Sequence, residues 1–211
     1  MGEIDLNKFG LSGKIGPIVA YITKSGKQAY REYIVPNDPR TPKQLAYRSK
    51  FALVNSSLTP FCKVIKDGYS QKHNAYRSVI SKVLREAIEG EYPNFRINYS
   101  KMQVAGGRLQ LPADITSEFD SELGALRITW NTKTCDDSKY NRSGDKVNIV
   151  CFDESRKKVF VKYYAASRRD GELTHQINES YEYINPKDLH FWIYLSSRDL
   201  EDNSDSWYVE V

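Results

Sequence analysis

Three prolines within seven residues set the strongest constraint on how this chain folds. They lie in the segment VPNDPRTPKQ, which ends at Gln44. Proline has no N–H for a strand ladder, and the Asn and Asp between the prolines favour turns, so a strand cannot continue past Pro36. Thr41 can cap a helix, Pro42 suits the first helical position, and Gln44 completes a capping box. The segment therefore predicts a strand before it and a helix after it.

The residues before this break predict a β-hairpin. Segments 15–23 and 28–35 are rich in β-branched and aromatic residues, and Lys-Ser-Gly-Lys separates them. Glycine supplies the positive φ that a tight hairpin turn needs. Neither face of the second strand is cleanly apolar, so we expect a partly solvated ribbon. Such a ribbon must pack against something else to be stable.

Three helices are expected after the break. The first carries an apolar stripe at spacings of four, three and four, with Phe51 near its centre, and we expect this stripe to lie in the core. A short helix spans about 61–67. A third begins near Asn74 and ends at Gly90, with one apolar face. The first helix's stripe consists of Tyr47, Phe51, Val54 and Leu58.

Short strands separated by polar turns dominate the rest of the chain. Segment 108–112 could open a sheet, and alternating or apolar runs follow at 123–130, 146–152, 157–165, 172–177, 189–196 and 206–211. About seven short strands in a hundred residues are typical of an immunoglobulin-like or fibronectin-type sandwich. Segments 131–145 and 197–206 are expected to be exposed loops.

The predicted fold class is α+β, in two domains. A β-hairpin plus three-helix module spans 1–108, and an all-β immunoglobulin/fibronectin-III-like sandwich spans 109–211. Charge supports the division, because residues 1–110 hold 18 basic and 8 acidic residues and residues 111–211 hold 13 and 19.

No pattern of residues indicates catalysis, a metal or a cofactor. The sequence lacks phosphate-loop, dinucleotide-binding and metalloprotease motifs. A triad of Ser167, Asp170 and His175 can be assembled on paper, but chance explains it better. Cys62 and Cys151 have apolar neighbours and are expected to be buried. We therefore expect a protein that is not an enzyme.

No segment indicates secretion or membrane insertion. The first residues lack an apolar signal segment, and no run of 18 apolar residues exists. The expected location is cytoplasmic.

Basic residues crowd the hairpin and the first helix, interleaved with tyrosines. They could contact a phosphate backbone or an acidic protein. The other interpretation is a solvated positive face, because Glu32 and Asp38 interrupt the group. These candidate partner or nucleic-acid contacts are Lys14, Lys24, Lys27, Arg31, Arg40, Lys43, Arg48 and Lys50.

The same region resembles a known family. Gly-Lys-Ile-Gly at 13–16, the hairpin, Pro-Arg-Thr-Pro-Lys-Gln at 39–44 and Arg-Ser-Lys-Phe at 48–51 resemble an uncharacterised bacterial family found mainly in Bacteroides and its relatives. The pattern over 38–51 is more weakly similar to small prophage-encoded proteins. The resemblance covers the whole chain, and the family has no established activity to carry over.

Two functions follow from these observations. The leading hypothesis is a non-catalytic structural or protein-interaction protein with an unidentified protein partner, for instance a phage-derived assembly component. The alternative is a nucleic-acid-binding protein that acts through the basic hairpin and first helix.

Overall fold

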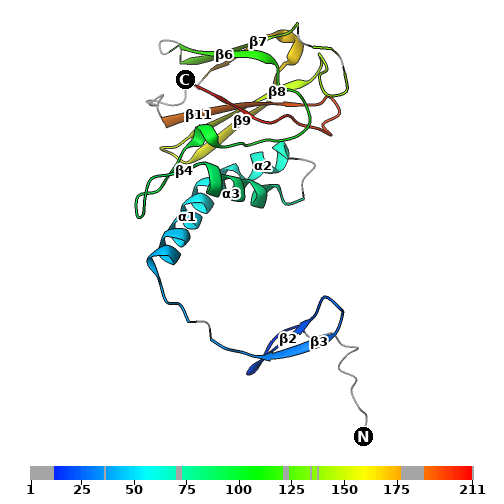
Figure 1. The fold of residues 1–211 in the computed structure, drawn as a ribbon. Coiled ribbons are helices and arrows are strands. Elements are labelled where there is room, and N and C mark those ends of the chain that lie inside the picture. Colours follow the sequence, from blue (N-terminus) through cyan, green and yellow to red (C-terminus); the bar gives the residue numbers. More distant parts are fainter. Residues whose placement is uncertain are drawn as a thin grey trace. The chain divides into compact units, whose positions relative to one another are not determined.

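The structure is a computed structural model, and it describes residues 12–35, 37–69, 73–120, 124–133, 135–136, 138–176 and 188–210. The chain divides into two compact units, residues 1–41 and 42–211 (Figure 1). The first unit is a small sheet. The second holds the helices and two larger sheets, so the fold is mixed α and β with antiparallel sheets.

The first unit is a three-stranded ribbon. Its strands β1 (Gly13–Ile15), β2 (Ile18–Ile22) and β3 (Gln28–Glu32) pair in that order. Gly16 and Gly26 turn the chain between them with φ of 59° and 79°, a region that glycine enters without steric cost. The predicted hairpin is thus confirmed, and β1 adds a strand to it.

The helices of the second unit follow directly. Helices α1 (Pro42–Leu58), η2 (Thr59–Phe61) and α2 (Cys62–Gly68) run on without a break, and α3 spans Ala75–Glu86. A small ribbon of β4 (Ile88–Glu89) and β5 (Arg96–Ile97) and the turn η3 (Tyr99–Lys101) come next. Helix α3 buries the apolar face that its spacing predicts, through Ala75, Val79, Ile80 and Val83.

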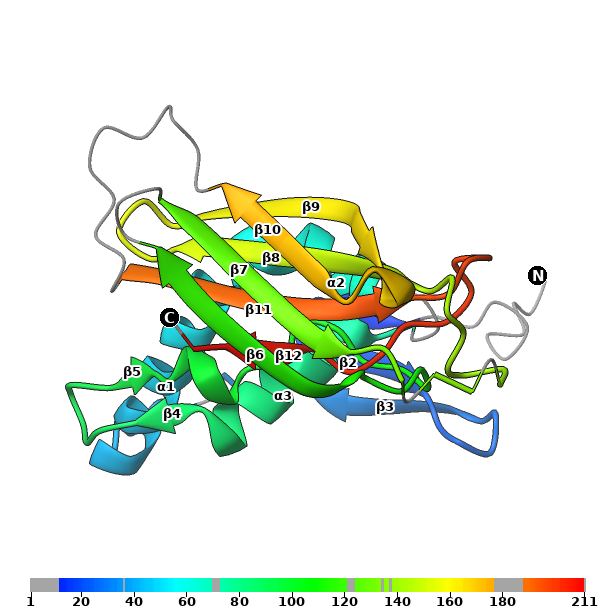
Figure 2. The same cartoon turned by 90° about the horizontal axis from the view of Figure 1, so that it is seen from above.

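Seven strands form two sheets. The two sheets pack face to face (Figure 2). The three-stranded sheet has the order β10-β7-β6 and the four-stranded sheet the order β12-β11-β8-β9. Side chains from both sheets share one core, which includes Leu126, Ile128, Ile149 and Phe191. In chain order the strands are β6 (Ala113–Asp120), β7 (Ala125–Asn131), β8 (Lys146–Asp153), β9 (Lys158–Ser167), β10 (Glu172–Gln176), β11 (Leu189–Ser196) and β12 (Trp207–Val209), with the turn η4 (Arg168–Asp170) between β9 and β10.

The helices cover the outer face of the four-stranded sheet. A second core joins Leu58, Phe61 and Val83 of the helices to Phe152 and Trp192 of the sheet. The Trp192 indole donates to the carbonyl of Met102 at 2.9 Å. Strand β11 is therefore buried on both faces, whereas its alternation predicts a single core-facing set.

The compact units divide the chain differently from the predicted boundary at residue 108. Residues 42–108 share a core with the four-stranded sheet, and the division falls between Thr41 and Pro42. The reversal of charge near residue 110 therefore does not coincide with the division between the compact units.

The first helix departs from its predicted burial. Val54 and Leu58 are buried, but Tyr47 is 64% and Phe51 47% exposed. The apolar stripe therefore lies in the core over its second half only. The prediction that Phe51 is a core residue is wrong, because only the C-terminal half of α1 contributes buried residues.

Two further predictions about burial are wrong. Cys62 is exposed at the start of α2, although Cys151 is buried as predicted. The expected surface loops are partly internal, since Asn141, Asp145, Asp202, Asn203 and Ser204 are buried. Their side chains bond neighbouring segments, so polarity there does not indicate exposure.

Candidate interaction surface

The eight basic residues singled out from the sequence divide between the two units. Lys14, Lys24, Lys27, Arg31 and Arg40 belong to the first unit, and Lys43, Arg48 and Lys50 lie on α1 in the second. These residues are close in the sequence, but they do not form a single surface within one compact unit.

Several of these cations have local contacts. The Lys14 ammonium lies 3.7 Å from the centroid of the Tyr33 ring, and that of Lys50 lies 4.7 Å from the Phe95 ring. Arg40 lies 3.7 Å from the carboxylate of Asp38. Contacts of this kind at exposed sites contribute on the order of 0.5–1 kcal/mol or less. These contacts orient the basic side chains but do not indicate a ligand.

The register of the ribbon gives it two different faces. Residues that pair directly across an antiparallel ladder point to the same side of the sheet. Ile15 pairs with Ile18, Ala20 with Tyr30, and Ile22 with Gln28. One side, called here the apolar face, therefore carries Ile15, Ile18, Ala20, Ile22 and Tyr30 beside Gln28 and Glu32. The other, called here the basic face, carries Lys14, Val19, Tyr21, Ala29 and Arg31.

Within the first unit, no residue that the structure describes covers the apolar face. Ile15, Ile18, Ile22 and Tyr30 are 38–51% exposed, and only Ala20 is buried among the described residues of the ribbon. A two- or three-stranded sheet needs a packed face to be stable in water. Exposed apolar side chains gathered on one face mark interaction sites.

The apolar face of the ribbon was not predicted from the sequence. The second strand alone, with Gln28 and Glu32 beside Tyr30, does not look apolar. The signal lies in β2, where Ile18, Ala20 and Ile22 alternate, and in the turn at Gly16 that brings Ile15 beside Ile18.

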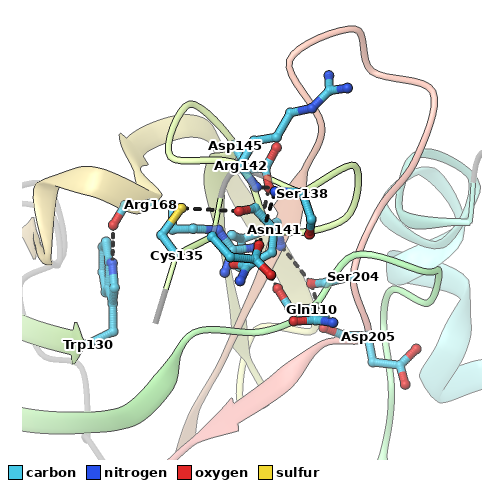
Figure 3. Close-up of polar contacts among 12 residues, drawn as sticks. Gln110, Trp130, Cys135, Ser138, Asn141, Arg142, Asp145, Arg168, Ser204 and Asp205 are labelled. Atoms are coloured by element: carbon cyan, nitrogen blue, oxygen red, sulfur yellow. Dashed lines mark hydrogen bonds and ion pairs between the residues drawn. The ribbon is translucent and has the colours of Figure 1, made fainter. Parts of the chain in front are cut away.

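A buried charged cluster holds one end of the two-sheet body together (Figure 3). Arg168 donates to the carbonyl of Gln110 at 2.6 Å and to Asp145 at 3.3 Å, and its own carbonyl accepts from the Trp130 indole at 2.6 Å. Burial raises the pKa of the Asp145 carboxyl, against the opposing effect of the Arg142 N–H and of Arg168. The arginine side chain is 2% exposed, so we assign this cluster a structural role.

The Ser167, Asp170 and His175 side chains are not arranged as a catalytic triad in the structure. Asp170 accepts from the backbone N–H of Ser167 in a capping box, and the Ser167 hydroxyl accepts from Lys146. The His175 ring packs against Phe191, with centroids 6.4 Å apart, and burial lowers its pKa.

Neither a cluster of metal ligands nor a membrane-spanning helix occurs among the residues that the structure describes. Between residues 12 and 210, apart from the gaps given above, no three His, Cys, Asp or Glu side chains converge as metal ligands do. Over the same residues, no helix is long and apolar enough to cross a membrane.

Comparison with known proteins places the chain in a family. The model described as "Family of unknown function (DUF6266)" matches residues 10–210. The chain belongs to this family. The match spans both compact units, which agrees with a resemblance that covers the whole chain. Neither the curated proteins nor the solved structures gave a match.

Proposed function

We propose that this protein is a non-catalytic interaction protein whose ribbon binds another protein through its apolar face. The open face of Ile15, Ile18, Ile22 and Tyr30 supports this most directly. Fully burying one such side chain contributes about 1.5–3 kcal/mol, so covering four half-exposed ones supplies a useful part of a protein–protein affinity.

A protein partner fits this face better than nucleic acid does. Single-stranded nucleic acid is bound by stacking on aromatic rings and by rows of cations. Three of the four large side chains on the apolar face are isoleucines, which offer neither. The basic face, with Lys14, Tyr21 and Arg31, keeps nucleic-acid binding as the second candidate.

The two-sheet body supports the same function. Its seven strands divide into β10-β7-β6 and β12-β11-β8-β9, and the chain changes sheet three times between β7 and β11. We interpret this order as a fibronectin-type sandwich, an architecture that many cell-surface domains use to present surfaces. A phage-derived assembly component is one form of this proposal, supported by the resemblance over 38–51.

Site-specific photo-crosslinking tests the proposal. A benzophenone amino acid replaces Ile22 on the apolar face or, as the matched control, Tyr21 on the basic face of the same strand. Each full-length variant is expressed in native host cells and irradiated. We expect discrete protein-sized adducts from position 22 and few or none from position 21.

Two results would contradict the proposal. One is the absence of adducts from position 22. The other is nuclease-sensitive adducts from position 21, which would favour the nucleic-acid alternative.

A further inference from the structure

The second unit contains a groove lined by tyrosines. It has a volume of about 1020 Å³ and lies between α2 and the start of α3 on one side and strands β9 and β11 on the other. Five tyrosines line it, and the loop after β11 adds Leu200 and Asn203. The tyrosines are Tyr69, Tyr76, Tyr163, Tyr164 and Tyr194.

A continuous chain of hydrogen bonds connects the two walls of this groove. The backbone N–H of Tyr164 donates to Asn148 at 3.0 Å, and the Asn148 amide donates to Ser196 at 2.8 Å. The Ser196 hydroxyl donates to Asn203 at 2.6 Å, and the Asn203 amide donates to the carbonyls of Asp67 and Gly68 at the end of α2. Every donor in this chain points the same way, an arrangement in which each bond strengthens the next.

Tyr163 adds a further hydrogen bond between the two walls of the groove. Its hydroxyl donates to the Asp67 carboxylate at 2.6 Å. Burial raises the pKa of Tyr69 to about 12 and also raises that of Tyr194. These phenols therefore stay protonated at neutral pH and can donate hydrogen bonds.

Tyr164 occupies a costly backbone conformation in the groove wall. Its φ is 55°, a left-handed value that is strained for a non-glycine residue. The ladder between β8 and β9 is irregular here, because pairing passes from Val147–Ala166 to Ile149–Lys162. Such bulges redirect side chains beside functional sites. The result is a phenol that is 51% exposed, in contact with the groove.

The charged residues that line the groove indicate which kind of ligand it binds. Lys63 and Lys66 lie on the exposed side of α2, and neither makes an ion pair with any residue that the structure describes. The Asp67 carboxylate between the walls is engaged by Tyr163. On the opposite wall Leu200 is 51% exposed and, like Tyr164, has a left-handed backbone, with φ of 61°.

We propose that this groove binds an acidic segment of a partner protein, with carboxylates on Lys63 and Lys66 and an apolar side chain between Tyr164 and Leu200. Asn148 is the positioning residue, since it accepts the N–H that holds Tyr164 in the bulge. Single-stranded nucleic acid fits less well. Tyr164 alone among the groove tyrosines is classed as exposed, and the other exposed large side chain of the lining, Leu200, is aliphatic, so successive bases lack stacking platforms.

Fluorescence anisotropy of the full chain tests this proposal. The probes are a fluorescein-labelled octapeptide of glutamates with one central phenylalanine, its lysine counterpart, and an oligo-dT of similar length. We expect the acidic peptide alone to bind. Lys63→Glu with Lys66→Glu should weaken it at least tenfold, whereas Lys133→Glu with Lys158→Glu, outside the groove lining, should leave binding unchanged.

Tyr164→Gly separates binding from folding. Glycine adopts a φ of 55° freely, so the variant should melt at or above the parental temperature while peptide affinity falls at least tenfold. Parental affinity in this variant, or in the Lys63 and Lys66 double variant, overturns the proposal. So does tighter binding of oligo-dT than of the acidic peptide, or no binding of the acidic peptide.

Discussion

At the scale of single residues, burial decides which aromatic side chains hold the second unit together. The Phe61 ring is fully buried against Phe152 and Trp192, with centroids 4.7 and 5.6 Å away. Phe51, one helix earlier, is 47% exposed. Phe61→Ala should therefore lower the free energy of unfolding by about 3–5 kcal/mol, as large core truncations do.

Phe51→Ala is the matched control, because it deletes the same ring from an exposed position. Its cost should stay below about 1 kcal/mol. Urea titrations of both variants measure the difference. Equal losses in the two variants would show that the first half of α1 is a core element after all.

Burial along α1 could be predicted from the sequence only in part. The burial of Val54 and Leu58 follows from helical spacing, but the same spacing predicts that Phe51 and Tyr47 are equally buried. Spacing places residues on one face of a helix without saying how far the neighbouring sheet extends along it. Asn148 could not be recognised at all, since its role depends on a bulge in the partner strand.

At the scale of elements, strand positions were readable and strand partners were not. Alternation locates β7, β8, β9 and β11 within a few residues of their observed bounds. Strand β6 was missed because its inward positions mix Ile115 and Phe119 with Ser117. The apolar face of the ribbon needed the pairing of β1 with β2, which only a register supplies.

The tyrosines of the groove walls predict a loss of stability in alkali. Burial, followed by the charge of Asp205, raises the pKa of Tyr69 from 10.0 to about 12. A group whose pKa is higher in the folded state stabilises the fold fully below its unfolded pKa, and this contribution is lost as the pH rises through the folded pKa. We therefore expect the urea midpoint to fall between pH 10 and 12.

Tyr69→Phe provides the control, because it keeps the ring and removes the titrating hydroxyl. Its urea midpoint should fall less over this range than that of the parent. Identical pH profiles for the two proteins would contradict the assignment of this effect to Tyr69.

At the scale of the whole molecule, the helices and the two-sheet body of the second unit depend on each other. A fragment of residues 42–211 keeps both cores and should unfold cooperatively. A fragment of 109–211 exposes Val150, Phe152, Trp192 and Tyr194, which the helices otherwise cover. Losing their burial costs about 6–12 kcal/mol, comparable with the whole stability of a domain.

Circular dichroism and thermal melting of the two fragments measure this dependence. The longer fragment should give one sharp transition, and the shorter should give none or aggregate. A stable, cooperatively folded 109–211 fragment would support the division at residue 108 that the reversal of charge suggests.

The proposed function requires that the apolar face of the ribbon binds a protein. Quantitative mass spectrometry of proteins co-purified with the tagged full-length chain tests it most directly. The parent is compared with Ile18→Glu/Ile22→Glu on the apolar face and with Lys14→Glu/Arg31→Glu on the basic face. We expect recovery of at least one partner to fall tenfold or more with the first variant and to be kept with the second. Equal recovery from all three proteins, or loss only with the basic-face variant, would contradict it.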